Sequence, residues 1–366
     1  MDTQLLEETA RSLVAAGKGL LEIDESDATC QMRFGAVGLT CTPETRREYR
    51  ELLLTTPGVE GFVSGVALHD ETLWQSASSG QVFRQHLAQL GILPGVRVDK
   101  GLVDLPGFPG EKISQGLDDL PERISAYAGA GVRFAKWRSV ITIGDNVPTD
   151  ECIGANTFVL ARYARICQEA GVVPIVEPEV MVDGTHTAER CEQVMAHVFD
   201  ILFQTMRAFR VHLPGTILKT SMVLPGKDSG APINHDEASE RTVRVFTEHV
   251  PADLAGIVFL SSGLTTNDTA ADFDHIIDRL KVMNRTARMQ TPGWGVTFSY
   301  SRALQDPVLK AWAENQDNHE GAQRRFLRQL QLLSDAVRGE LDESQLQGDG
   351  STPEDRESSA NPSESQ

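Results

Sequence analysis

Short apolar runs recur eight times along this chain, and a stretch with helical spacing follows each of them. The runs begin about 30 to 45 residues apart, which is the length of one strand, one helix and their loops. Eight such units predict an α/β fold, a single-domain (β/α)8 TIM barrel. The predicted strands are LLEID (20–24), GFVSGVAL (61–68), PGVRVD (94–99), VRFAKWR (132–138), VVPIVEPE (172–179), GTILKT (215–220), GIVFLSS (256–262) and WGVTFS (294–299).

Between these runs, apolar residues recur at intervals of three and four, as they do on one face of a helix. The clearest predicted helices are 159–170, 191–206 and 322–337. An open, doubly wound sheet is the alternative α/β fold, but no GxGxxG sequence follows a predicted strand. The barrel is therefore the preferred prediction.

The end of the chain differs in composition from the rest. From Glu340 to Gln366 there are eight acids and one arginine, so this segment carries −7 of the chain's net charge of −18. It is rich in Ser, Gly, Pro and Gln, and it has too few apolar residues to offset the entropy lost on ordering. We predict a catalytic barrel domain over residues 1–339 and a disordered acidic C-terminal tail over 340–366.

Charge and cysteine content exclude several classes of partner. A net charge of −18 argues against nucleic acid or an anionic membrane, because either would require a basic face. The chain has no apolar run long enough to span a membrane, and its N-terminus lacks the basic and apolar regions of a signal peptide. The five cysteines show no CxxC or other metal-ligand spacing. We therefore expect a reduced, cytoplasmic protein.

Ionisable and hydroxyl side chains stand at the ends of most predicted strands, where apolar residues would be expected. In a (β/α)8 barrel these carboxyl ends form the active-site face, and several strands contribute catalytic groups. Any one such residue is equally well explained by a solvent-facing strand end or an internal salt bridge. A ring of them instead favours an active site made from Asp24, Arg97, Asp99, Lys136, Arg138, Glu177, Glu179, Lys219, Ser261, Ser299 and Arg302.

The lysines suggest an amine nucleophile. Lys219 follows an apolar segment of its strand, where burial and the nearby Lys136 would favour a neutral amine. A neutral lysine attacks a ketone to form a Schiff base, which acts as an electron sink when the adjacent carbon–carbon bond breaks or forms. Glu177 or Glu179 would move the protons needed for carbinolamine dehydration. Asp24, the remaining acid, would act as a base on a substrate hydroxyl.

The last two predicted strands lead into a predicted anion site. SSG (261–263) and SYSR (299–302) combine hydroxyls, a glycine and an arginine where such barrels commonly bind phosphate. The guanidinium of Arg302 matches the spacing of phosphate oxygens. The alternative is an ordinary Ser-Gly turn without a ligand.

These motifs resemble a known family. LLEIDES (20–26), VRVDKG (96–101), FAKWR (134–138), PIVEPE (174–179), ILKT (217–220), FLSSG (259–263) and TFSYSRALQ (297–305) resemble, in order, motifs of the class I fructose-bisphosphate aldolases. The resemblance covers about residues 10–330. It implies a (β/α)8 barrel that forms a homotetramer, needs no metal or other cofactor, and reversibly cleaves fructose 1,6-bisphosphate. The products would be dihydroxyacetone phosphate and glyceraldehyde 3-phosphate, in glycolysis and gluconeogenesis.

The resemblance also implies roles for individual residues. Lys219 resembles the Schiff-base lysine, and Glu177 the acid and base of carbinolamine dehydration, supported by Glu179 and Lys136. Asp24 resembles the group that acts on the C4 hydroxyl. The C1-phosphate site is matched by Ser261, Gly263, Ser299 and Arg302. The residues that match the site for the far end of the sugar, with its C6 phosphate, are Ser26, Thr29, Arg33 and Arg138.

Some positions of the predicted binding sites depart from the family pattern. Met32 and Arg97 stand where the family usually has lysines, and Asp27 stands where it has an uncharged residue. The loss of a lysine at Met32 and the gain of an acid at Asp27 weaken the attraction for the C6 phosphate at the far end of the sugar. Arg97 keeps the positive charge in the predicted site. Ser262 and Ser301, which we include in the C1-phosphate site, each replace a small residue, glycine for the first and glycine or alanine for the second.

Two further departures concern catalysis. Glu22 and Ile23 occupy positions that are small or apolar in the family. The family's C-terminal tyrosine is absent, since no aromatic residue follows Phe326, so protonation of the enamine must be slower or use another donor.

Other functions remain open at this point. One is a Schiff-base aldolase for a different ketose phosphate, motivated by the altered far end. Another is a non-catalytic barrel used as a scaffold, although the intact set of charged strand-end residues argues against it. A zinc-dependent aldolase is disfavoured, because no two histidines lie three to five residues apart and only His69 lies at a strand end.

Overall fold

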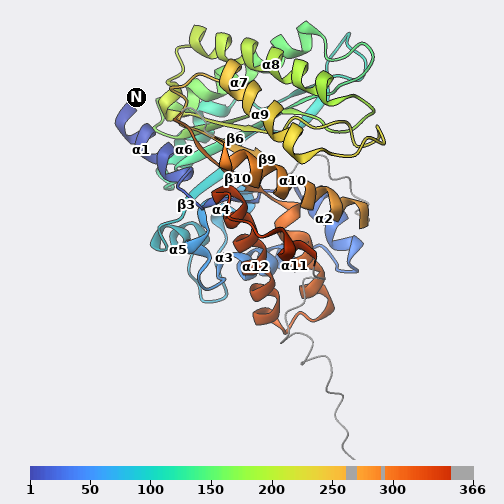
Figure 1. Cartoon of the computed structure of the whole chain (residues 1–366). Helices are drawn as coiled ribbons and strands as arrows, with labels where there is room; N and C mark the ends of the chain where they lie inside the picture. Colours follow the sequence, from blue (N-terminus) through green and yellow to red (C-terminus); the bar gives the residue numbers. More distant parts are fainter. Residues whose placement is uncertain (261–269, 290–292, 348–366) are drawn as a thin grey trace, which may run out of the picture.

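The computed structural model describes residues 1–260, 270–289 and 293–347, and its centre is a closed barrel of eight parallel strands (Figure 1). Around the barrel the strands follow the order β1-β10-β9-β8-β7-β6-β3-β2, and β1 pairs with β10 to close it. The predicted TIM barrel and its eight strands are confirmed. The strands are β1 (Gly19–Ile23), β2 (Val63–Leu68), β3 (Leu93–Arg97), β6 (Phe134–Ile141), β7 (Val173–Val180), β8 (Ile217–Thr220), β9 (Gly256–Leu260) and β10 (Gly295–Tyr300).

Helices surround the barrel (Figure 1). Side-chain caps fix where several of them begin: Thr149 accepts from the backbone N–H of Cys152, and Thr187 accepts from that of Arg190. The predicted helices lie in α7, α8 and α12. After β3 the chain forms a hairpin of β4 (Leu102–Asp104) and β5 (Lys112–Ser114). The helices are α1 (Thr3–Leu13), α2 (Asp27–Ala36), α3 (Pro43–Leu54), α4 (Asp70–Trp74), α5 (Phe83–Gln89), α6 (Leu120–Gly129), α7 (Asp150–Glu169), α8 (Ala188–Ala208), α9 (His235–His249), α10 (Ala270–Arg288), α11 (Arg302–Glu314) and α12 (His319–Arg338).

Apolar side chains fill the part of the barrel where the strands begin. Gly95 leaves room for Phe134 there, because a Cβ on this glycine would lie 2.3 Å from the ring. Helix α1 adds Leu6 and Leu13 to the same cluster, which closes this end of the barrel to water. A polar site is therefore restricted to the other end. The strand residues of the cluster are Leu20, Ala67, Phe134, Val173, Ile175, Ile217 and Val258.

The segment after α12 continues to pack on the barrel domain. Leu341 is buried, and its backbone N–H and carbonyl both bond to the side chain of Asn284. Leu346 is also buried, and Glu343 lies 2.7 Å from Arg285. Residues 340–347 thus differ from the predicted disordered tail, because their two leucines bury apolar surface. The rest of that predicted tail, 348–366, lies outside the described residues.

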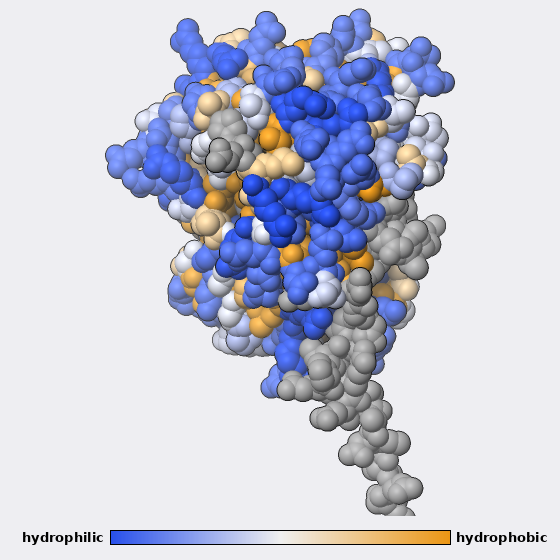
Figure 2. All heavy atoms as spheres, viewed as in Figure 1, coloured by the Kyte–Doolittle hydropathy of each residue, from blue (hydrophilic) through white to orange (hydrophobic). Residues whose placement is uncertain are grey.

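Hydrophilic side chains cover most of the molecular face seen in Figure 2, with smaller apolar areas between them. Three of the exposed large apolar side chains in the described chain lie on separate elements: Met32 on α2, Trp74 on α4 and Phe158 on α7. None of the described helices combines the length and the apolar character that crossing a bilayer requires.

Candidate active site

Five ionisable side chains converge where the barrel strands end. They are Glu22 on β1, Asp24 directly after it, Lys136 on β6, Glu177 on β7 and Lys219 on β8. Each of these residues is at most 5% exposed. Charges taken out of water at such depth must be paired with one another or lose their charge, so contacts within this group decide its chemistry.

Strand alternation explains why these side chains point inward. Residues two apart on a strand share a face, so the residue two positions after an interior apolar residue also enters the barrel. Within one pleat the barrel interior changes from apolar to charged. The successive inward pairs are Leu20 and Glu22, Phe134 and Lys136, Ile175 and Glu177, and Ile217 and Lys219.

The amine of Lys219 lies between two carboxylates. Its Nζ donates to Glu22 Oε1 and lies 3.0 Å from Glu177 Oε1. The same oxygen of Glu22 accepts a hydrogen bond of 2.7 Å from Ser299 Oγ. A buried lysine with proton acceptors on two sides has the arrangement that an amine nucleophile requires.

Lys136 joins three carboxylates. Its Nζ lies 2.6 Å from Asp24 Oδ2, 3.2 Å from Glu22 Oε2 and 4.0 Å from Glu177 Oε2. Burial alone would lower the pKa of Lys136, but these three carboxylates outweigh it and raise the pKa above its usual range. Lys136 is therefore a fixed cation at neutral pH.

The carboxylates differ in how easily they hold a proton. Burial raises the pKa of Glu177 to about 7, although Lys219 and Lys136 act in the opposite direction. Burial also opposes the charge of Glu22 and Asp24, but Lys136 and a second cation outweigh it, so the pKa of each is lowered. At neutral pH Glu22 and Asp24 are charged, while Glu177 exchanges its proton. An acid–base group of this kind is tuned for proton transfer near pH 7.

Glu179 is paired with an arginine, and neither lysine of the cluster is among its ion-pair partners in the described chain. Its Oε2 accepts from Arg138 Nε, so the pair joins β6 and β7. The Arg138 side chain is 38% exposed, whereas that of Glu179 is 4% exposed. Glu179 therefore holds a cation at the barrel mouth, and this cation can meet an anionic ligand.

The predicted C1-phosphate site is only partly within the described residues. Ser261, Ser262 and Gly263 lie outside them. Ser299 is buried against Glu22, as described above. Ser301 Oγ donates to Glu25 Oε1 at 3.0 Å, and Arg302 begins α11. The two described serines thus donate to carboxylates, while the arginine lies at a helix N-terminus beside the mouth.

Arg33, predicted to contact the far end of the sugar, is paired with two carboxylates. It donates to Glu25, and its Nη2 lies 2.6 Å from Asp306 Oδ1. Only 9% of its side chain is exposed. The charge of Arg33 is thus balanced inside the protein.

The other predicted far-end residues lie around the start of α2 and the end of β3. Ser26 caps α2 by accepting from the backbone N–H of Thr29 at 3.4 Å, and the two hydroxyls lie 3.1 Å apart. Arg97 Nε lies 3.7 Å from Asp99 Oδ2, and its side chain is 25% exposed. Arg97 and Arg138 are therefore more accessible than Arg33.

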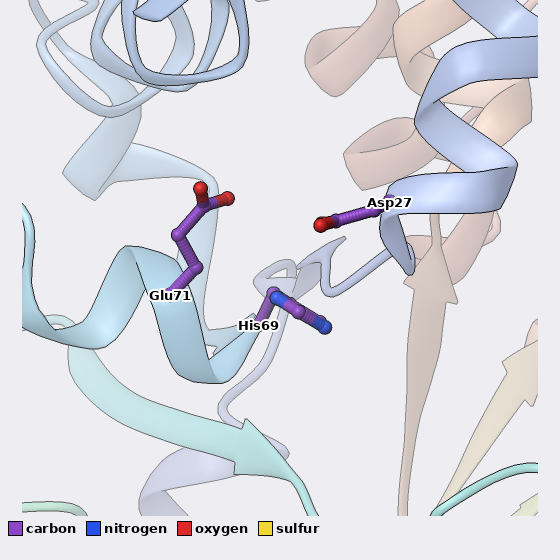
Figure 3. A group of neighbouring side chains, drawn as sticks. All are labelled: Asp27, His69 and Glu71. Atoms are coloured by element: carbon purple, nitrogen blue, oxygen red, sulfur yellow. The ribbon is translucent and has the colours of Figure 1, made fainter. Parts of the chain in front are cut away.

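Asp27, His69 and Glu71 form a separate cluster at the mouth (Figure 3). Asp27 reaches across from the start of α2, whereas the other two lie at the start of α4, and their ligand atoms lie within 4.8 Å of one another. Both oxygens of Glu71 are already paired with Arg46 and Arg50, at 2.7 and 3.0 Å. Two guanidinium groups at this distance would repel a divalent cation, so we propose no metal centre here.

Sequence reasoning missed the part that Glu22 plays in the site. From the sequence it is only a charged residue at a position where the family has a small or apolar one. Its position two residues before Asp24 places both on the inward face of one strand, and this alternation was a usable signal. Gln305, which donates to the backbone carbonyl of Glu22 and to Glu25, gave no such signal.

Comparison with known proteins decides the family. The family described as fructose-bisphosphate aldolase class-I matches residues 5–358. The chain belongs to the class I fructose-bisphosphate aldolases. This aldolase is 46% identical over 315 residues to a probable fructose-bisphosphate aldolase class 1 of Xylella fastidiosa, covering 86% of this chain and 91% of that one. It is 41% identical over 323 residues to the cytosolic fructose-bisphosphate aldolase 4 of Arabidopsis thaliana, covering 88% and 80%.

A solved structure agrees with the fold of this aldolase. The fructose-bisphosphate aldolase of Plasmodium falciparum, crystallised with TRAP and a small-molecule inhibitor, has a TM-score of 0.88 and 39% identity. The match covers 93% of this chain and 95% of that one. This aldolase is a lyase that reversibly cleaves fructose 1,6-bisphosphate to dihydroxyacetone phosphate and glyceraldehyde 3-phosphate. A different ketose phosphate and a non-catalytic scaffold are not favoured.

Proposed function

We propose that this aldolase cleaves its substrate through a Schiff base on Lys219 and uses no metal ion. The observation that carries the proposal is the place of this lysine, 2% exposed at the polar end of the barrel and between Glu22 and Glu177. The iminium formed by this amine would withdraw electrons from the bond between C3 and C4 of the sugar, so no metal is needed to stabilise the carbanion.

Glu177 is the proposed acid of carbinolamine dehydration. It is within 3.0 Å of the Lys219 amine, so it also lies within reach of a hydroxyl on the carbon that this amine attacks. A pKa of about 7, caused mainly by burial, lets the same group give a proton and take it back. Lys136 would stabilise the anionic form between these transfers.

Asp24 is the proposed base for the C4 hydroxyl. Its pKa is lowered, because Lys136 and Arg97 outweigh the effect of burial, so the carboxylate is charged at neutral pH. Removal of the C4 hydroxyl proton starts carbon–carbon cleavage and leaves an enamine on Lys219. Lys136, 2.6 Å from Asp24, holds this carboxylate in place.

The phosphates of the substrate would bind at opposite sides of the mouth. For the C1 phosphate we propose Arg302 together with Ser261, Ser262, Gly263, Ser299 and Ser301. For the far end we propose Arg97 and Arg138 as the principal cations, since they are accessible, with Ser26, Thr29 and Arg33 beside them. A guanidinium is suited to bidentate contact with phosphate oxygens.

Cleavage of fructose 1,6-bisphosphate in the presence of a metal chelator tests the proposal. We expect the purified protein to release triose phosphate at the same rate with and without excess chelator, because the amine itself supplies the electron sink. A coupled assay that follows triose phosphate measures this rate. Loss of activity on chelation, with recovery on adding a divalent cation, would reject the metal-free route.

We also propose that the protein works as a homotetramer in the cytoplasm, as the family resemblance suggests. The cytosolic relative in Arabidopsis thaliana supports the compartment. Light scattering on a sizing column would report the mass of the assembly directly, and a mass of one chain would reject the tetramer.

A further inference from the structure

Glu22 uses both of its carboxylate oxygens inside the candidate active site. Oε1 accepts from Lys219 Nζ and from Ser299 Oγ, while Oε2 lies 3.2 Å from Lys136 Nζ. The side chain is 5% exposed, and its backbone carbonyl accepts from Gln305. A buried carboxylate with this many partners is held in one position, and that position is against the nucleophile.

The presence of Glu22 changes the charge balance of the cluster. Lys136 and Lys219 carry two positive charges, and Glu22 and Asp24 suffice to balance them. Glu177 is then a third carboxylate, and in the described chain its Oε2 has no hydrogen-bond partner. Burial opposes the charge of Glu177 most strongly and the carboxylate of Glu22 adds to this effect, so the proton stays on Glu177 up to a higher pH.

We propose that Glu22 is an additional catalytic residue of this aldolase, which accepts the proton released by Lys219 and thereby leaves Glu177 free to supply its own. The inference rests on the Schiff-base function proposed above. With Glu22 present, one carboxylate takes the proton from Lys219 and a second carboxyl group gives a proton to the carbinolamine. A site with Glu177 alone must use one carboxyl group for both transfers.

Each proton that moves in this route has a donor and an acceptor. The ammonium of Lys219 gives one proton to Glu22, and the amine lone pair forms the C–N bond while the carbonyl π electrons move to oxygen. The attacking nitrogen passes a proton to that oxygen, which gives the neutral carbinolamine. Glu177 then protonates the hydroxyl, the C–O bond breaks, and water leaves as the iminium forms. Return of the proton from Glu22 to Glu177 restores the initial protonation of both carboxyl groups, while Lys219 carries the iminium.

Among the described residues, the groups known to act on Glu22 or bond to its side chain belong to this cluster. Lys136 comes from β6, Glu177 from β7, Lys219 from β8 and Ser299 from β10, while Asp24 lies directly after β1. Glu179 on β7 acts in addition on Glu177. The positive charge of Arg97 on β3 helps to lower the pKa of Asp24, after the larger effect of Lys136. A simpler interpretation is that Glu22 merely neutralises buried cations. The contact with Lys219 Nζ argues for more, because a neutralising charge does not need to bond to the reacting atom.

The variant Glu22→Gln separates these interpretations. We expect Schiff-base formation with dihydroxyacetone phosphate to slow by about 10²-fold, since the nucleophile loses its proton acceptor. We also expect the decline of this rate at high pH to begin about one pH unit lower, because one anion that disfavours ionisation of Glu177 is gone. The rates come from quenching with borohydride at timed intervals over a pH series, followed by intact mass.

Two further variants make the result specific. Glu240→Gln makes the same charge change at an exposed position on α9 and should leave rate and pH profile unchanged. Glu22→Asp keeps the charge but shortens its reach, so trapping should slow while the decline at high pH stays in place. If Glu22→Gln does not fold, Glu22→Asp tests the proposal in its place. A rate of Schiff-base trapping in Glu22→Asp equal to that of the unaltered protein would overturn the proposal.

The outcomes also separate this inference from the proposed function. If the unaltered protein is trapped on Lys219 and Glu22→Gln has the same rate and pH profile, Glu22 is only a neutralising residue and the inference fails alone. If the unaltered protein is not trapped on Lys219 at all, the Schiff-base function itself fails.

Discussion

Replacing Lys219 by alanine should reduce the rate of fructose 1,6-bisphosphate cleavage by at least about 10⁴-fold. The reason is that the other amine in the described part of the site cannot replace it: the amine of Lys136 is held as a cation by three carboxylates, so it cannot attack a carbonyl. A steady-state assay at saturating substrate measures the loss.

Lys219→Arg is the matched control for this prediction. Arginine keeps a cation beside Glu22 and Glu177, so it preserves the charge balance but cannot form a Schiff base. We expect it to be as inactive as the alanine variant while unfolding at a higher temperature. Measurable cleavage by either variant, above the level of contaminating enzyme, would contradict a nucleophilic Lys219.

Glu177→Gln should lower kcat by about 10²- to 10⁴-fold, the usual contribution of a positioned acid–base group. In the unaltered enzyme the protonated form of Glu177 supplies a proton to the leaving hydroxyl. This form is lost as the pH rises through about 7, so kcat should decline above that pH. In Glu177→Gln the residual activity should show no such decline, because glutamine does not titrate.

Glu179→Gln controls for the removal of a neighbouring carboxylate. Glu179 bonds to Arg138 and not to the lysines, so its loss should affect substrate binding more than the pH dependence. A decline near pH 7 that survives in Glu177→Gln would assign the titration to another group.

The barrel was predictable because its signal is repeated. Eight apolar runs at regular spacing each gave a strand, and the confirmed helices α7, α8 and α12 followed from periodicity in the same way. The end of the domain was less predictable. Two leucines after Gly339 distinguish the packed residues 340–347 from the acidic segment beyond, and the first of them, Leu341, is bonded to Asn284, which is far away in the sequence.

The set of residues at the candidate site was predictable, but their pairing was not. Alternation along a strand indicates which residues enter the barrel, so Asp24, Lys136, Glu177 and Lys219 could be placed together. Alternation does not say which carboxylate lies against which lysine, since this depends on the stagger between strands from distant parts of the chain. For that reason the contact of Glu22 with both lysines, and the pairing of Arg33 with Glu25 and Asp306, became known only from the structure.

The most direct test of the proposed Schiff base is the mass of the protein after borohydride reduction with dihydroxyacetone phosphate, followed by peptide mapping. The expected result is one reduced triose phosphate adduct per chain, located on Lys219 and absent from Lys219→Arg. An adduct on a different lysine, or no adduct on folded protein that still cleaves fructose 1,6-bisphosphate, would contradict it.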